Sequence, residues 1–185
     1  MQRLMAILLI ILVMPVWLVL IIIQLLVFGN IWFKQVRAGK NGRLFTILKF
    51  QSLKARKDEQ QLEKDRLNGW GRFLRASSLD ETPQLINIIK GEMAFVGPRP
   101  LLPEYWELYT PWQKRRHEVK PGITGWAQVN GRNALSWQDQ FKQDVWYVDH
   151  RNLWLDARIL FLTLKKVISR PSRENYLREA FNGKN

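Results

Sequence analysis

The chain opens with a long apolar segment. Residues from Leu4 to Ile23 carry no charge, and apolar residues resume at 25–28 after Gln24. About 20 consecutive apolar residues can cross the hydrocarbon core of a bilayer as a helix. The run is longer than the apolar region of a signal peptide, and no clear small-x-small cleavage site follows it. The pattern therefore predicts a membrane helix within residues 1–33.

Two features of this segment favour a re-entrant helix over a simple span. Pro15 lies near the middle, where proline removes a backbone donor and clashes with the preceding turn, so we expect a kink. Both flanks are basic, and such flanks tend to stay cytoplasmic; they contain Arg3 before the segment and Lys34, Arg37, Lys40 and Arg43 after it. Both ends on one side would require a helix that enters, bends at Met14-Pro15 and returns. A simple transmembrane anchor is the alternative.

The remainder alternates short extended pieces with amphipathic stretches. The spacing of apolar residues and the turn signals predict extended segments at 44–48 and 93–96, a hairpin at 127–129, and helices at 83–90, 103–119, 136–148 and 153–168. The last helix is rich in apolar and aromatic residues and ends in basic ones. That composition suits either a helix in the bilayer interface or an ordinary core helix.

Composition narrows the partners. The chain has 185 residues, 29 Lys+Arg and 16 Asp+Glu, which gives a net charge of +13. Such an excess fits nucleic acid, an anionic membrane face or an anionic substrate. The absence of cysteine excludes disulfides and thiolate metal sites. The sequence also lacks a phosphate-binding P-loop, a dinucleotide fingerprint and a zinc pattern.

Two adjacent carboxylates, Asp80 and Glu81, stand out in this basic chain. They precede Pro83, which suits the first position of a helix, and a helix start attracts carboxylates and phosphates alike. A carboxylate can attack phosphorus when Mg²⁺ and arginines neutralise the substrate. Helix capping is the alternative, because Ser78 and Glu81 also fit a capping box. A helix capped at Ser78 would, however, place Pro83 beyond the tolerated first turn.

Basic residues near the pair are candidates for binding phosphate. Arg75 precedes Asp80 by a short turn, and Arg99 lies between two prolines that stiffen its backbone. The planar guanidinium matches phosphate oxygens bidentately. Lys49, after the predicted strand, is a further candidate for the substrate phosphate. A solvated surface position or a lipid headgroup contact is the alternative for any single arginine.

A turn-rich stretch at 121–131 supplies softer candidates. Gln128 and Arg132 could contact the nucleotide or the sugar, although such loops are often only structural. His117 is isolated in the sequence and gives no metal cluster, so we expect a structural role for it.

Taken together, these blocks resemble the bacterial sugar transferases, the small monotopic phosphoglycosyl transferases. The similarity runs along nearly the whole chain, including Pro15, and it rests on residues 49–50, 78–85, 90–93, 95–100, 116–117, 120–132 and 146–147. Within that family the chain is similar to members that begin glycan assembly with diacetylbacillosamine. The ending Phe181-Asn182-Gly183 adds to this likeness.

The resemblance implies a reaction at the cytoplasmic face of the bacterial inner membrane. A sugar 1-phosphate would pass from a UDP-sugar to undecaprenyl phosphate, with release of UMP. Carried over, Asp80 would attack the β-phosphorus and contact Mg²⁺, and Glu81 would assist metal binding or proton handling. The expected partners include no nucleic acid, and a homodimer is left open.

The fold expected from pattern and resemblance is α+β and mostly helical. It would consist of a re-entrant membrane helix at 1–33 and a single catalytic domain at 34–185 with interfacial amphipathic helices. A membrane-anchored basic binding module is the competing hypothesis: it explains the charge and the tryptophans, and predicts salt-sensitive binding without turnover. It leaves Asp80-Glu81 and Pro98-Arg99-Pro100 without a purpose. A multi-spanning transferase is disfavoured, because one apolar segment cannot build a helix bundle.

Overall fold

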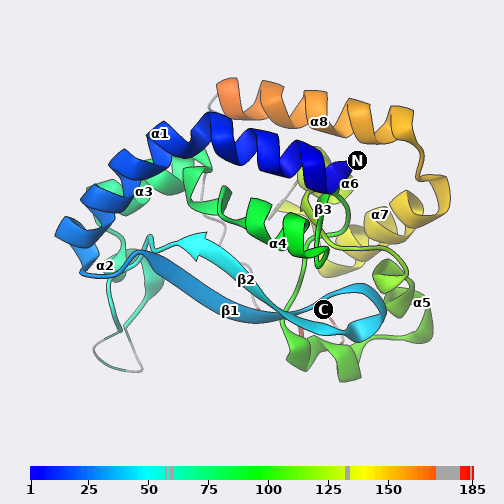
Figure 1. The fold of residues 1–185 in the computed structure, drawn as a ribbon. Coiled ribbons are helices and arrows are strands. Elements are labelled where there is room, and N and C mark those ends of the chain that lie inside the picture. The colour runs from blue at the N-terminus through cyan, green and yellow to red at the C-terminus, as the bar shows by residue number, and fades with distance from the viewer. Residues whose placement is uncertain (57, 59–60, 132–133, 170–179, 184) are drawn as a thin grey trace. The chain divides into compact units, whose positions relative to one another are not determined.

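The structure is a computed structural model that describes residues 1–56, 58, 61–131, 134–169, 180–183 and 185. The chain divides into two compact units: the first comprises residues 1–35 and 47–90, and the second comprises 36–46 and 91–185. The division passes through a hairpin in which β1 (Trp32–Ala38) pairs with β2 (Leu44–Phe50) (Figure 1). The short helix η1 (Lys40–Gly42) forms its turn.

The first unit is dominated by α1 (Gln2–Phe28), a helix of 27 residues with Pro15 inside it. It ends at Gly29, whose positive φ of 65° suits a residue without a Cβ. Among the described residues, α1 is the one helix long and apolar enough to cross a membrane. The predicted apolar helix is therefore confirmed, whereas re-entry at Pro15 stays a prediction.

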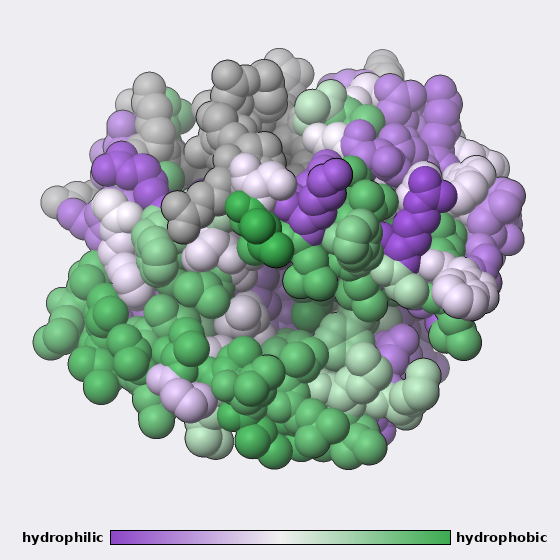
Figure 2. Space-filling model, turned by 90° about the horizontal axis from the view of Figure 1, so that it is seen from above, coloured by the Kyte–Doolittle hydropathy of each residue, from purple (hydrophilic) through white to green (hydrophobic). Residues whose placement is uncertain are grey.

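One face of α1 is buried within the first unit. The buried side chains are Ala6, Trp17, Leu20 and Gln24. The helix lies alongside α4 (Gln84–Lys90), as Figure 1 shows. Most other apolar side chains of α1 remain exposed, and hydrophobic residues form a broad area on the face seen in Figure 2. A helix that is packed on one face and leaves apolar side chains exposed on the other requires an apolar environment for the exposed face.

Three short helices complete the first unit. They are α2 (Glu63–Arg66), α3 (Gly69–Ser77) and the 3₁₀ turn η2 (Leu79–Glu81). The side chain of Asn68 caps α3 by accepting a hydrogen bond from the Gly71 backbone N–H. The core of the unit joins Trp17 and Leu20 of α1 to Phe50 and Leu74.

The second unit is built around a small parallel sheet. β3 (Ala94–Val96) pairs with β4 (Gly122–Thr124), with Ala94 opposite Gly122. A Cβ on Gly122 would lie 2.1 Å from the backbone nitrogen of Gly97, so the close approach of these two segments requires glycine.

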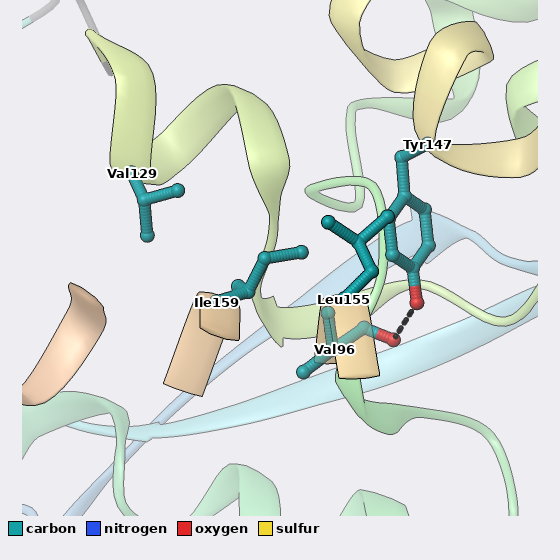
Figure 3. Close-up of a cluster of buried hydrophobic side chains, with 5 residues drawn as sticks. All are labelled: Val96, Val129, Tyr147, Leu155 and Ile159. Atoms are coloured by element: carbon teal, nitrogen blue, oxygen red, sulfur yellow. Dashed lines mark hydrogen bonds between the residues drawn. The ribbon is translucent and has the colours of Figure 1, made fainter. Parts of the chain in front are cut away.

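Helices make up much of the rest of the second unit. They are η3 (Pro103–Leu108), α5 (Pro111–Lys114), η4 (Arg115–His117), α6 (Trp126–Asn130), α7 (Trp137–His150) and α8 (Leu153–Ile168). Helix α8 contacts both strands of the sheet. Figure 3 shows one buried cluster, formed by Val96, Val129, Tyr147, Leu155 and Ile159. The Tyr147 hydroxyl lies 3.3 Å from the carbonyl oxygen of Val96 and 2.7 Å from an Asp156 carboxylate oxygen. Burial, and then Asp156, raise the pKa of this hydroxyl.

Most predicted elements are confirmed, one is confirmed in part and one is wrong. The strand at 44–48 and the helices at 83–90, 136–148 and 153–168 are all present. Residues 103–119 form three short helical pieces, because Thr110 caps a new helix that begins at Pro111. Residues 127–129 lie in helix α6, because their backbone bonds locally, with Val129 N donating to Gly125 O at 3.1 Å. The mostly helical α+β class is confirmed, while the interfacial placement of α8 stays a prediction.

Candidate active site

Asp80 and Glu81 lie on the tight turn η2, between α3 and α4. The turn begins after Ser78, which has a left-handed φ of 60°. It closes through hydrogen bonds from Glu81 N to Ser78 O, at 3.1 Å, and from Thr82 N to Leu79 O, at 3.2 Å. Ser78 makes no capping hydrogen bond through its side chain. The capping-box alternative is therefore wrong, and both carboxylates stand on a separate turn.

Lys49 reaches this turn from β2. Its Nζ lies 2.7 Å from Glu81 Oε1, and the two side chains are 18% and 21% exposed. Asp80, next to Glu81, is 8% exposed. Three of the predicted residues thus form one local site, in which a cation sits directly beside the carboxylate turn. Partial exposure leaves the ion pair accessible to a substrate.

Arg75 lies in the last turn of α3, and its Nε donates to Ser52 Oγ at 3.0 Å. Close packing fixes this contact, because a Cβ on Gly71 would lie 2.0 Å from the carbonyl oxygen of Ser52. The fixed Nε orients the guanidinium plane. Ser52 was not predicted from the sequence as a partner of Arg75. Its hydroxyl, three residues after Lys49, was the available signal for such a partner.

Arg99 lies in the second unit, on the loop that follows β3. Its carbonyl oxygen accepts a hydrogen bond of 2.7 Å from an Arg116 guanidinium nitrogen. Arg116 in turn donates to Asp144 at 2.7 and 3.0 Å, and both side chains are 1% exposed. Burial opposes the charge of Arg116, but Asp144 and Tyr109 together outweigh it and raise the pKa of the guanidinium. This buried ion pair anchors the backbone of Arg99.

Sequence reasoning also missed Asp144 and the role of Arg37. Asp144 stands among the apolar positions Phe141 and Val145 of α7, a placement that signals a buried partner. Arg37, at the end of β1 that belongs to the second unit, was predicted only as a basic flank. Burial and the neighbouring Arg99 lower the pKa of Arg37. Tyr105 and Glu104 act against this shift.

Gln128 is on α6 and is 8% exposed. Within the part of the chain that the structure describes, neither its Oε1 nor its Nε2 has a hydrogen-bond partner. A buried amide without partners costs free energy, so such a group invites a polar ligand. The contact of Gln128 with nucleotide or sugar stays a prediction. Arg132 lies outside the described residues.

His117 is buried in the second unit. Its Nδ1–H donates to the carbonyl oxygen of Gly39 at 3.0 Å. Burial, and then the charge of Arg116, lower the pKa of His117 to about 3. A neutral, packed imidazole agrees with the structural role expected for this residue.

The carboxylate turn offers two candidate ligands for Mg²⁺. Among the residues described, no three His, Cys, Asp or Glu side chains cluster to hold a metal ion. Mg²⁺ commonly takes one or two carboxylates and completes its shell with water and substrate phosphates. Asp80 and Glu81 are the two carboxylates that the turn offers to such an ion. The residues present fit a Mg²⁺ that is shared with a phosphate substrate.

Comparison with known proteins gives the family. The family described as bacterial sugar transferase matches residues 1–170. The chain belongs to this family. The sugar transferase EpsL of Bacillus subtilis, which is uncharacterised, is 51% identical over 150 residues, covering 80% of this chain and 74% of the relative. The membership makes this protein a transferase.

Two further relatives are longer than this chain. The galactosyl transferase CpsE of Streptococcus agalactiae is 40% identical over 159 residues, covering 76% of this chain and 35% of the relative. A UDP-glucose:undecaprenyl-phosphate glucose-1-phosphate transferase of Xanthomonas campestris is 39% identical over 158 residues. The match covers 78% of this chain and 33% of the relative. The chain thus spans about a third of the length of these two relatives. The lipid acceptor in the name of the Xanthomonas relative and the apolar helix α1 indicate membrane association.

Proposed function

We propose that this sugar transferase moves a sugar 1-phosphate from a UDP-sugar to undecaprenyl phosphate and releases UMP. One observation carries the proposal: Asp80, Glu81 and Lys49 form a charged site in the same compact unit as the apolar helix α1. The activity in the name of the Xanthomonas relative supports the substrate classes. A basic binding module would not need adjacent carboxylates on a turn of their own.

Asp80 is the proposed nucleophile. A carboxylate oxygen of Asp80 attacks the β-phosphorus, and the bond from that phosphorus to the bridging oxygen breaks. UMP leaves with the bridging oxygen, and the sugar phosphate stays on Asp80. A phosphate oxygen of undecaprenyl phosphate then attacks the same phosphorus and displaces the Asp80 carboxylate. The product carries a diphosphate between lipid and sugar.

The other residues supply charge and orientation. Lys49, held at 2.7 Å from Glu81, places a cation beside the reacting carboxylate. Arg75, oriented by Ser52, would bind a phosphate oxygen. Asp80, with Glu81 assisting, would hold a Mg²⁺, which neutralises the charge of the diphosphate when bound. Arg99 would contact phosphate, and the nucleotide or sugar would meet Gln128 and Arg132.

The experiment uses the Asp80→Asn variant and a UDP-sugar labelled in its β-phosphate. Wild-type protein should release UMP and keep label on the protein when the lipid acceptor is withheld. Asp80→Asn should lose transfer by at least about 10³-fold and keep no label, with membrane binding unchanged. Full activity in this variant would refute Asp80 as nucleophile. Absence of UMP release from a broad panel of UDP-sugars would favour the binding module.

The sugar is proposed from the resemblance. UDP-diacetylbacillosamine, or a similar N-acetylated amino sugar, is the proposed donor. The comparison proteins carry names with galactose and glucose, so the donor must be chosen by assay. The panel should therefore include UDP-glucose, UDP-galactose, UDP-N-acetylglucosamine and UDP-diacetylbacillosamine. Faster release from either hexose donor than from both acetamido donors would overturn this part of the proposal.

The helix α1 is proposed to enter the cytoplasmic leaflet and return at Pro15. Its 27 residues would measure about 40 Å if straight, longer than a hydrocarbon core of about 30 Å. Trp17, near the middle of the helix, donates a hydrogen bond to Thr82. Gln24, in the C-terminal half, donates one to the backbone of Gln51. A helix that crossed the bilayer would carry these polar segments into hydrocarbon, at a high cost.

The topology can be tested because the chain lacks cysteine. Single cysteines at positions 2 and 35 should both react with an impermeant reagent from the cytoplasmic side. Labelling of position 2 only from the periplasmic side would establish a simple span instead.

A further inference from the structure

Within the first unit, the turn that carries Asp80 is closed by a side chain as well as by the backbone. The Thr82 hydroxyl donates to the carbonyl oxygen of Leu79 at 2.8 Å. Asp80 and Glu81 are the two residues enclosed between these partners. The conformation of the turn therefore depends on where the Thr82 hydroxyl is held.

The membrane helix holds that hydroxyl. The indole Nε1–H of Trp17 donates to Thr82 Oγ1 at 3.0 Å. Trp17 lies two positions after Pro15 and is only 9% exposed. In such a dry setting, a hydrogen bond is strong and an unpaired indole N–H is costly. The contact therefore fixes the turn relative to α1.

The same indole also contacts the strand that carries Lys49. The ring of Trp17 meets the ring of Phe50 edge to face, with centroids 5.7 Å apart. Phe50 directly follows Lys49, and Thr82 directly follows Glu81. One tryptophan thus touches the neighbours of both members of the Lys49–Glu81 ion pair.

A second attachment lies about two helical turns further along α1. Gln24 is fully buried; its Nε2 donates to the carbonyl oxygen of Gln51 at 2.8 Å, and its Oε1 accepts from Trp70 Nε1 at 3.4 Å. Gln51 precedes Ser52, the partner of Arg75. The helix is therefore bonded at two levels to the segments that hold the charged side chains.

We propose that Trp17 is a positioning residue, through which the membrane helix sets the geometry of the Asp80 turn and the Lys49–Glu81 pair. The proposal rests on the proposed function. A shift of the helix in the bilayer would move the turn and the strand, and displacements of about 1 Å can cost two orders of magnitude in rate. The residue does not contact the reacting atoms itself.

The test combines two conservative changes. Trp17→Phe removes the indole N–H and keeps an aromatic ring, and Thr82→Val removes the hydroxyl at nearly constant shape. Each should lower kcat about tenfold, with the KM for UDP-sugar changed less than about twofold. The double variant should be no slower than Thr82→Val alone, because Thr82→Val already removes the bond to Trp17. Thr82→Ser, which retains the hydroxyl, should restore most of the rate.

Trp32→Phe is the matched control. Trp32 stacks on the same Phe50, with centroids 5.3 Å apart, and within the described part of the chain its indole makes no hydrogen bond to the turn. Its kcat should stay within about twofold of wild type. Full activity of Trp17→Phe, multiplied losses in the double variant, or an equal loss in Trp32→Phe would each overturn the proposal.

A spectroscopic measurement separates this proposal from the reaction itself. The ¹⁵N-labelled indole resonance of Trp17, assigned through its disappearance in Trp17→Phe, should move upfield in Thr82→Val. An unmoved resonance would overturn the positioning role. If the wild-type protein releases no UMP but the Trp17 resonance still moves in Thr82→Val, the proposed function is refuted and the contact between Trp17 and Thr82 is established.

Discussion

The ion pair of Lys49 and Glu81 is the central charge feature of the candidate active site. With Nζ and Oε1 2.7 Å apart and both side chains about four-fifths covered, neither charge is fully hydrated. An exposed pair is worth little, but a partly buried carboxylate that loses its partner is costly. The pair is therefore placed to act as a unit beside Asp80.

Replacing Lys49 by Met should lower kcat/KM for UDP-sugar by about 100-fold, because the site loses a fixed cation. The double change Lys49→Met with Glu81→Gln should be no worse than Lys49→Met alone. UMP release measures both. Lys142→Met, which breaks an exposed pair with Asp139, is the control and should leave the rate unchanged. Independent, multiplying losses would contradict a functional pair.

His117 gives a prediction about pH. Its pKa is about 3 in the folded protein, against about 6.5 in an unfolded chain. Between these values the unfolded state binds a proton that the folded state does not. The contribution of His117 to the free energy of unfolding is therefore complete above about pH 6.5. It falls as the pH drops toward 3, by about 1.4 kcal/mol per pH unit.

His117→Asn should flatten this part of the profile. The difference in melting temperature between wild type and variant should shrink as the pH is lowered from 7 to 4.5. A constant difference over that range would show that His117 is not buried in its neutral form.

At the scale of elements, helix α7 holds the loop that carries Arg99. Asp144 of α7 binds Arg116, and Arg116 binds the carbonyl oxygen of Arg99. Removing one partner of a buried ion pair typically costs about 3–5 kcal/mol, because the other charge stays buried. This element therefore links folding of the second unit to the placement of Arg99.

Asp144→Asn should lower the free energy of unfolding by about 3 kcal/mol or more. Chemical denaturation in detergent measures the loss. Combining it with Arg116→Met should recover part of the stability. Asp149→Asn is the matched control, since its partner Arg115 is exposed, and it should cost less than about 1 kcal/mol. Equal losses at the two aspartates would contradict the buried pair.

Secondary-structure elements could be predicted where the local sequence pattern determines them. The apolar run, the helix at 153–168 and the turn residues before 44–48 follow from periodicity and turn chemistry. The errors arose where contacts with segments distant in the sequence determine the structure. Residues 122–124 are a strand because β3 lies beside them, which no local pattern reveals. In the site, Asp80, Glu81, Lys49 and Arg75 could be named from residue type and resemblance. Trp17 could not, because its partner is 65 residues away.

At the scale of the whole molecule, charge and apolar surface act together. A net charge of +13 attracts the chain to anionic lipid, and α1 supplies the apolar contact. Helix α8 adds exposed apolar side chains at Leu153, Trp154, Phe161, Leu164 and Ile168. These suit the boundary between headgroups and acyl chains.

A reporter dye on α8 can test this placement. A cysteine at Trp154, which is 87% exposed, should carry a dye whose emission shifts to the blue when vesicles are added. Lipids with a quencher at shallow depth should then reduce the signal. A cysteine at Lys142, also exposed, is the control and should show neither effect. An unshifted dye at position 154 would place α8 in water.

The bond from Trp17 to Thr82 also has a consequence for biosynthesis. At about 5–20 residues per second, a ribosome adds the intervening 65 residues in roughly 3–13 s. During that interval the nascent helix α1 can already meet lipid, while the partner of its indole has not yet been made. The turn that carries Asp80 can therefore reach its final geometry only after residue 82 has been made, and a nascent chain released before that point would contain α1 without the partner of its indole.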